Sequence, residues 1–267
     1  ADPGADLAGR VRPRGVLRMS RRSLDELLAA IDEVDGWLST DQAARLYDAA
    51  STTDVGDQIV EIGSYRGRST IMLAGAAPEG VAVVAIDPHA GNDRGPREIS
   101  GFERQAVTDH ELFNANLAAA GVAGRVRHIR EFSDRAHAFV SGPIAVLYID
   151  GAHRYGPARS DIRAWGGRVG PGGTMLIHDS FSSVGVTLAI GRELFFGSQF
   201  RYVGRSRTLV EYRADLDQGW QSRVPNALRQ IAQLPWFAKN ITLKIMLRLR
   251  LAGLLRRITG RTPEWPY

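Results

Sequence analysis

Short apolar runs rich in β-branched residues alternate with helix-like stretches through the middle of this chain. The runs cover residues 58–63, 81–87, 126–132, 145–150 and 173–179, and the stretches between them cover 69–77, 102–120, 134–140 and 157–169. Nearly continuous apolar strands, each followed by a helix, are typical of a parallel sheet buried on both faces. After a helix near 184–196, the segments 200–206 and 208–214 predict an antiparallel hairpin. The pattern therefore predicts an α/β protein with a doubly wound, seven-stranded sheet.

The segments on either side of this alternation differ from it in composition. The predicted organisation is a disordered leader at 1–20, an N-terminal helical cap at 21–54, an α/β domain at 55–216 and a basic helical C-terminal extension at 217–267. In the cap, Ser23 with Glu26 three residues later is the signature of a helix N-terminus, and Thr40 is the expected N-cap of a second helix. The extension carries an apolar stripe made of Leu247, Leu251, Leu254 and Ile258.

The composition excludes several classes of function. The chain of 267 residues has no cysteine, so thiolate metal sites and cysteine nucleophiles are absent. Its net charge of +5 comes almost entirely from arginine, because Lys239 and Lys244 are the only lysines. The sequence carries no nucleic-acid-binding signature, no apolar run of the roughly 18 residues that span a bilayer, and no apolar signal-peptide core within 1–20. We therefore expect a cytoplasmic protein that does not bind nucleic acid.

Acidic residues stand at or just beyond the end of each predicted parallel strand. They are Glu61, Asp87, Glu131, Asp150 and Asp179. In an open parallel sheet, ligands bind at the carboxyl ends of the strands, near the point where the strand order reverses. These five acids therefore mark the expected ligand-binding edge.

The turn after the first strand restricts the kind of nucleotide. Its sequence, GSYRGRS, has neither the lysine nor the spacing of a phosphate-binding loop. Gly63 and Gly67 also depart from the GxGxxG spacing of a dinucleotide site. Glu61 would repel a phosphate and attract a cation. The turn therefore favours a nucleoside that bears a positive charge and no phosphate.

Four motifs in order, VEIGSYRGRST, AIDPH, LYIDGAHRYG and GPGGTMLIHDSF, resemble the class I S-adenosylmethionine-dependent methyltransferases. The resemblance covers roughly residues 55–214 and is greatest to bacterial O-methyltransferases that act on sugars and natural-product hydroxyls. It implies a Rossmann-like fold and methyl transfer to a carbohydrate hydroxyl, with 1-O-methylation of a mannose oligosaccharide as one specific case. The alternatives are a small-molecule (catechol or macrolide-type) O-methyltransferase, a nicotinamide oxidoreductase, and a non-catalytic assembly domain.

The resemblance also implies which residues bind S-adenosylmethionine. They are Glu61, Gly63, Ser64, Gly67, Ser69, Asp87, Phe132, Ser133 and Asp150. Glu61 is expected to face the methionine end, and the glycines give access to the backbone. Asp87 is expected to accept hydrogen bonds from the two ribose hydroxyls. Phe132 and Ser133 are expected to border the adenine.

A second implied group is a divalent-cation site. Related enzymes place oxygen ligands at the ends of strands four and five, which here are Asp150 and Asp179. His178 occupies the third position, where relatives carry an oxygen ligand. Magnesium prefers oxygen ligands and is our first choice, whereas imidazole suits manganese or zinc better. His153, three residues beyond Asp150, is the expected general base, and Asp150 shares the catalytic role.

The basic extension has three interpretations. We expect it to pack across a second subunit in a homodimer. A peripheral contact with an anionic membrane is an alternative, because arginines and leucines mix in this segment as they do in interfacial helices. The third interpretation is that the extension closes over the acceptor.

Overall fold

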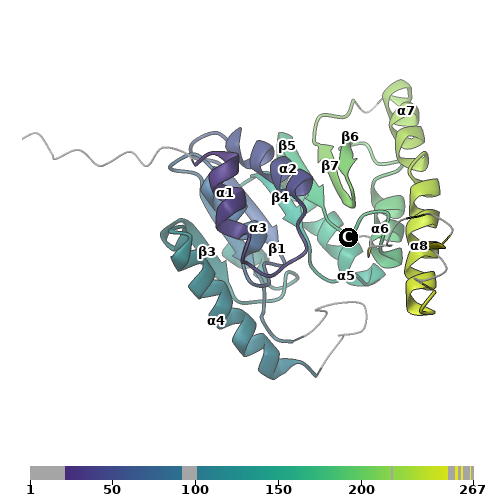
Figure 1. Ribbon diagram of the computed structural model, residues 1–267. Helices are drawn as coiled ribbons and strands as arrows, with labels where there is room; N and C mark the ends of the chain where they lie inside the picture. Colours follow the sequence, from purple (N-terminus) through teal and green to yellow (C-terminus); the bar gives the residue numbers. More distant parts are fainter. Residues whose placement is uncertain are drawn as a thin grey trace, which may run out of the picture.

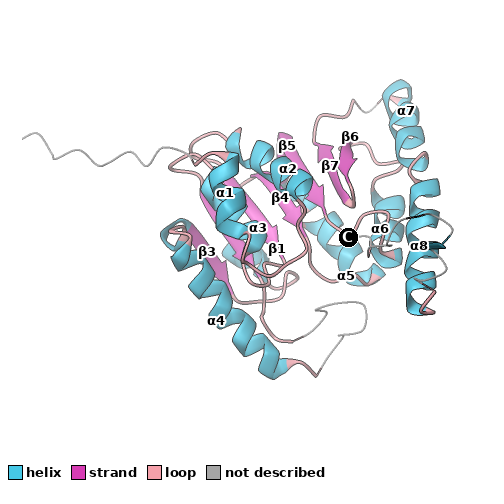
Figure 2. Cartoon of the chain, in the orientation of Figure 1, coloured by secondary structure: helices cyan, strands magenta, loops and turns pink. Residues whose placement is uncertain are grey.

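The computed structural model describes residues 22–91, 101–217 and 219–251, together with residues 256, 257, 260 and 265. The described chain contains a seven-stranded sheet (Figures 1 and 2). Its strands are β1 (Gln58–Ile62), β2 (Ala82–Ile86), β3 (Val126–Ile129), β4 (Ile144–Ile149), β5 (Val169–Ile177), β6 (Arg201–Ser206) and β7 (Leu209–Arg213). The order is β3-β2-β1-β4-β5-β7-β6, with β1 to β5 parallel and β7 antiparallel to both of its neighbours. The predicted doubly wound sheet and terminal hairpin are confirmed.

Helices cover both faces of the sheet (Figure 1). They are α1 (Leu24–Ile31), α2 (Thr40–Ser51), α3 (Arg68–Ala76), α4 (Glu103–Ala119), α5 (Tyr155–Ala164), α6 (Val184–Glu193), α7 (Trp220–Ile231) and α8 (Leu234–Arg248). One apolar cluster joins α1 to α4 with one face of the central strands, and a second joins α5 and α6 with the other face. The central strands are therefore buried on both sides, which explains their continuous apolar sequence.

The two N-terminal helices begin with capping boxes. The predicted cap at Ser23 is confirmed, because its backbone amide donates to the Glu26 side chain at 2.7 Å. The predicted cap at Thr40 is wrong by one residue. Ser39 is the N-cap, and its amide donates to Gln42 Oε1 at 2.9 Å. A serine followed by glutamine at the third helical position satisfies the free amides reciprocally, and Thr40 lacks such a partner three residues on.

Several predicted elements have other bounds in the structure. The helix expected at 134–140 is only a short 3₁₀ turn, Ala136–Phe139. Strand β3 ends at Ile129, so Phe132 lies in the following loop rather than at the end of the strand. The segment Gly170–Gly173 forms a bulge inside β5, because Val169 pairs with Ile144 and Thr174 pairs with Val146. The bulge lies at the start of β5, away from the candidate site, whereas the loop after β3 lies at the edge of the sheet that carries the site.

The C-terminal extension packs on its own chain. Helices α7 and α8 stand beside β6 and α6 (Figure 1), and Ile231, Trp236 and Phe237 contact the core. Helix α8 ends at Arg248 instead of continuing along the predicted stripe, of which Leu254 and Ile258 lie outside the described residues. The leader at 1–20 also lies outside them.

The outer surface of α7 carries an apolar row. Trp220, Val224 and Leu228 follow one another at four-residue spacing, and all three side chains are exposed. This row is a candidate subunit surface, and the homodimer stays a prediction. In the described part of the chain, every helix is too short or too polar to cross a membrane.

Candidate active site

The glycine turn and the end of β4 meet at the centre of the sheet, where the strand order reverses. Gly63 has φ of +84°, and its amide donates to the carbonyl oxygen of Ile86 at 2.9 Å. A Cβ atom at Gly63 would lie 2.2 Å from the carbonyl oxygen of Asp150. Glycine is therefore required by both conformation and space, and the close approach places the turn directly beside Asp150.

We predict that Gly63→Ala destabilises the fold by about 3 kcal/mol or more, because the left-handed conformation and the overlap with rigid backbone both oppose a Cβ. Gly121→Ala is the matched control. Gly121 has φ of +69°, and a Cβ added there would contact nothing. Gly121→Ala should therefore cost only the roughly 1 kcal/mol of the left-handed conformation, with no steric overlap. Urea denaturation of both variants measures the difference. Equal losses at the two positions would show that the contact with Asp150 is unimportant.

A cavity of about 550 Å³ lies along this edge of the sheet. Its walls come from the loops after β1, β2, β3 and β4, from the first turn of α3, and from the connection between α1 and α2. Among the predicted site residues, the cavity is lined by Gly63, Ser64, Ser69, Asp87, Phe132, Ser133, Asp150 and His153. The structure thus gathers residues from four separate loops around one space of ligand size. Glu61, Gly67, His178 and Asp179 lie outside this lining.

Glu61 lies behind the cavity wall, fully buried, and this placement corrects the expectation that its carboxylate faces the ligand. Its two oxygens accept hydrogen bonds from Ser69 Oγ, at 2.5 Å, and Thr70 Oγ1. Burial raises the pKa of Glu61 to about 8, although both hydroxyl hydrogen bonds act in the opposite direction. Side-chain alternation along β1 turns Glu61 toward α3, so the residue anchors the first turn of that helix.

The raised pKa makes Glu61 a source of pH-dependent stability. Between its ordinary pKa and about 8, the folded chain keeps a proton that the unfolded chain releases, so stability falls as pH rises through this window. Glu61→Gln does not titrate. We therefore expect its melting temperature relative to wild type to increase by roughly 3–10 °C between pH 5 and pH 8.

Thermal melts followed by circular dichroism across that pH range measure this effect. The exposed Glu79 gives the control, since Glu79→Gln should track the wild type at every pH. A Glu61→Gln variant whose melting temperature differs from wild type by the same amount at each pH would mean that Glu61 is ionised in the folded protein.

Asp87 ties the glycine turn to the end of β2. Its Oδ2 accepts from the amides of Ser64 and Tyr65, both at 2.9 Å, and its Oδ1 accepts from the His89 amide at 2.8 Å. The side chain also lines the cavity. A carboxylate can accept about four hydrogen bonds, so Asp87 keeps capacity for ligand hydroxyls.

The cavity wall beyond β3 contains an acid, Asp161, that does not follow a strand and was not predicted as a site residue. Asp161, on α5, lines the cavity and accepts a 2.6 Å hydrogen bond from Ser133 Oγ. Burial raises the pKa of Asp161 to about 6, against the lowering effect of that hydrogen bond. Asp161 lies within a helix, and only the packing of α5 beneath the β3 loop brings it to the cavity.

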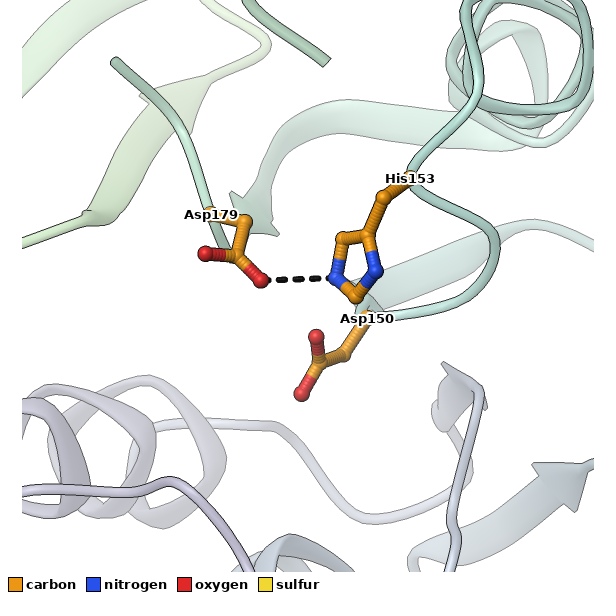
Figure 3. Close-up of side chains that lie close together, drawn as sticks. All are labelled: Asp150, His153 and Asp179. Carbon is orange, nitrogen blue, oxygen red and sulfur yellow. Dashed lines mark ion pairs between the residues drawn. The ribbon is translucent and has the colours of Figure 1, made fainter. Parts of the chain in front are cut away.

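Asp150, His153 and Asp179 converge at the ends of β4 and β5 (Figure 3). His153 Nε2 lies 2.6 Å from Asp179 Oδ2, and one ligand atom from each residue can be chosen so that all lie within 4.8 Å of one another. Both ring nitrogens of His153 are buried without a hydrogen bond of ordinary geometry. Burial lowers the pKa of His153, but the close contact with the Asp179 carboxylate and its negative charge outweigh this and raise the pKa overall. Two carboxylates and one imidazole at this spacing suit a divalent cation.

His178 stands behind this cluster rather than within it. Its side chain is 2 % exposed, and Nδ1 lies 3.3 Å from Asp150 Oδ1 and 3.6 Å from Asp179 Oδ2. Burial acts to lower the pKa of His178, but the two carboxylates raise it to about 10. The ring is therefore protonated at neutral pH in this arrangement. The cluster with metal-ligand spacing contains His153 in place of the predicted His178.

Tyr148 is a further residue that the sequence did not single out. Its hydroxyl donates to Asp150 Oδ2 at 3.0 Å from within β4, and the ring is buried. Burial and the neighbouring acids raise the pKa of Tyr148 well above its ordinary value, so it remains a donor. In the sequence, Tyr148 has the pattern of an ordinary core residue. Its side chain shares a face of β4 with Asp150 because side chains alternate along a strand with a period of two residues.

Comparison with known proteins agrees with this fold. Residues 60–180 match a family model described as a methyltransferase domain. This range includes the glycine turn, Asp150 and Asp179. Residues 60–180 are therefore similar to a methyltransferase domain, and the described chain has a Rossmann-like fold.

Solved structures with a similar fold include the O-methyltransferase NovP, at 16% identity over 66% of this chain and 81% of that chain, with a TM-score of 0.52. A protein from Corynebacterium glutamicum matches at 12% identity over 72% of this chain and 91% of that one, with a TM-score of 0.53. An O-methyltransferase from Bacillus cereus in complex with SAH matches at 16% identity over 71% and 90%, with a TM-score of 0.48.

Proposed function

We propose that this protein transfers a methyl group from S-adenosylmethionine to a carbohydrate hydroxyl, with a divalent cation held by Asp150, His153 and Asp179. The observation that carries the proposal is the position of this cluster. It adjoins a ligand-sized cavity beside the glycine turn, at the point where the strand order reverses. In this proposal the cofactor site and the acceptor site would share one edge of the sheet.

The cavity suits S-adenosylmethionine better than a phosphorylated nucleotide. Its lining includes Asp87, Asp150 and Asp161, and the turn at Gly63 lacks a lysine. The lining arginines are Arg68, which donates to the carbonyl oxygen of Val34, and Arg135 and Arg154. Asp87 would accept from the ribose hydroxyls, and Phe132 and Ser133 would border the adenine. Glu61 would act indirectly by holding Ser69, which lines the cavity.

The residues of the cluster fit a divalent cation. Carboxylate oxygens from Asp150 and Asp179 would be joined by a ring nitrogen of His153, whose nitrogens have no hydrogen bond of ordinary geometry. The imidazole favours Mn²⁺, and Mg²⁺ is the alternative. When bound, the ion would supply Lewis acidity that lowers the pKa of an acceptor hydroxyl.

The chain's own residues would orient the hydroxyl and take its proton. As the new O–C bond forms, the C–S bond of the sulfonium breaks and its electron pair stays on sulfur, which leaves as the neutral thioether. Asp150, the most exposed of the three side chains at 27%, is the proton acceptor that we propose. Tyr148 donates to Asp150 Oδ2 and would thereby fix the orientation of this carboxylate. His153 as general base is the alternative.

An exposed aromatic surface supports a carbohydrate acceptor. Trp37 is 56% exposed, lines the cavity and stacks on Tyr65 with ring centroids 5.8 Å apart. A flat aromatic face can pack against the apolar face of a sugar ring. Mannose oligosaccharides methylated at O-1 are the specific acceptors that we propose to test first.

The decisive experiment is a methyl-transfer screen with labelled S-adenosylmethionine against mannose oligosaccharides, other sugars, catechols and macrolides, with and without Mn²⁺ or Mg²⁺. Transfer to a sugar that ceases on chelation and returns with the metal is the expected result. Transfer only to phenols or macrolides would replace the carbohydrate assignment. No transfer and no cofactor binding would favour a non-catalytic assembly domain, and NADH binding would favour an oxidoreductase.

A further inference from the structure

Helix α8 reaches the acid cluster through one lysine. Lys244 Nζ donates to the carbonyl oxygen of Ser182 at 3.0 Å and to its hydroxyl oxygen at 3.3 Å. Ser182 Oγ in turn donates to Asp179 Oδ1 at 2.8 Å. A continuous chain of hydrogen bonds therefore connects the C-terminal extension to one of the carboxylates that would hold the cation.

The loop after β5 depends on the same helix for its shape. Asp179 and Phe181 have φ of +53° and +54°, a conformation that costs a side chain with a Cβ about 1–2 kcal/mol. Asn240 of α8 is 1% exposed and donates to the carbonyl oxygen of Phe181 at 2.8 Å. Such a conformation persists only where the surroundings hold it. Helix α8 supplies two of the contacts that do so, at Asn240 and Lys244.

The chemistry of the three groups fixes the direction of the hydrogen bonds. An ammonium group has only donors, whereas a serine hydroxyl has one hydrogen and two lone pairs. Because Lys244 occupies a lone pair of Ser182 Oγ, the hydroxyl hydrogen is directed toward Asp179. Asp179 Oδ1 is thereby engaged, and Oδ2 is left facing His153 at 2.6 Å.

We propose that Lys244 is a positioning residue of the active site, which acts through Ser182 to hold Asp179 Oδ2 toward the cation and His153. The proposal rests on the proposed cation site. It gives the C-terminal extension a role in the chemistry that is distinct from subunit contact or membrane binding. Partners of this kind, one shell outside the ligands, typically change metal affinity by about 10–100-fold when they are removed.

The test is the binding of Mn²⁺ alone to the full chain, measured by isothermal titration calorimetry. We expect Lys244→Met and Ser182→Ala each to weaken Mn²⁺ binding by about 10-fold. The double variant should be no weaker than either single variant, because both changes break one chain of hydrogen bonds. Lys244→Arg, which keeps a donor and the charge, should recover most of the affinity.

Lys239→Met is the matched control. Lys239 is the other lysine of the chain, lies on the same helix, and has its ammonium 5.0 Å from the Trp236 ring. The same chemical change there should leave Mn²⁺ binding unchanged. Melting curves identify any variant that fails to fold, and Ser182→Ala tests the connection from its other end with a smaller change.

The outcomes separate this proposal from the cation site itself. A wild type that does not bind Mn²⁺ overturns the cation site, and the role of Lys244 falls with it. A wild type that binds while Lys244→Met binds equally well overturns the role of Lys244 alone. Tighter binding by Lys244→Met, with no effect of Ser182→Ala, would mean that the lysine merely repels the cation, and this also overturns the proposal.

Discussion

Replacing His153 with alanine is expected to lower kcat by about 10²–10⁴-fold, whether the ring is a ligand or a general base. The His153 side chain lines the cavity, and its Nε2 lies 2.6 Å from Asp179 Oδ2. Its loss therefore removes one of the three side chains of the Asp150–His153–Asp179 cluster. Methyl transfer at saturating cofactor and acceptor measures the effect. His137→Ala is the control, since His137 stacks on Trp165 with ring centroids 4.2 Å apart, outside the cluster.

The same variant separates the two roles of His153. If the ring is a ligand, as its buried nitrogens indicate, Mn²⁺ affinity should fall by about 10-fold or more together with kcat. If the ring is only the base, Mn²⁺ should bind as in the wild type while turnover falls. Turnover and Mn²⁺ binding that both remain near wild type would remove His153 from the site.

Asp87→Asn is expected to weaken S-adenosylmethionine binding by about 100-fold, because the charge that strengthens its hydrogen bonds to ligand hydroxyls is lost. Calorimetric titration with S-adenosylhomocysteine measures this directly. Asp134 also lines the cavity, and its side chain is exposed, so Asp134→Asn is the control and should change affinity little.

Asp87 also holds the amides of Ser64 and Tyr65, so a loss of affinity alone does not identify a ribose contact. An S-adenosylhomocysteine analogue without the ribose 2′-hydroxyl separates the two effects. The wild type should prefer the complete ligand, and Asp87→Asn should bind both ligands equally weakly. An Asp87→Asn variant that keeps the full preference would show that Asp87 acts only through the glycine turn.

Local sequence patterns predicted most of the sheet correctly. The central strands β1, β2 and β4 are short and mostly buried, so each leaves a dense apolar run in the sequence. Strand β3 lies at the edge of the sheet, and its sequence VRHI is only partly buried. Element boundaries depend on finer signals than the apolar runs. Thr40 and Ser39 are both good N-cap residues, and only the glutamine three positions after Ser39 decides between them. Likewise, the segment after β3 has helical composition but forms a 3₁₀ turn under Trp165, whose indole Nε1 donates to the Ser133 carbonyl oxygen.

The candidate site was predicted in part. Asp87, Asp150 and His153 line the cavity, and Asp179 lies beside it, because strand ends in a parallel sheet share one edge. Glu61 and His178 were assigned ligand contacts from their positions in motifs, but the pleat and packing turn both into the protein interior. Asp161 and Lys244 were missed because each lies on a helix without a functional motif, and Tyr148 was missed because an aromatic residue inside an apolar strand has the pattern of a core residue.

The sequence by itself determined the layered α/β architecture, the glycine turn and the edge of the sheet at which the cavity lies. These follow from local periodicity and from the backbone freedom of Gly63, which each short segment carries within itself. Tertiary structure alone decided which imidazole joins the two aspartates, that Glu61 is buried, and that α8 contacts the loop after β5. Such contacts join residues far apart along the chain, so their geometry depends on how whole elements pack.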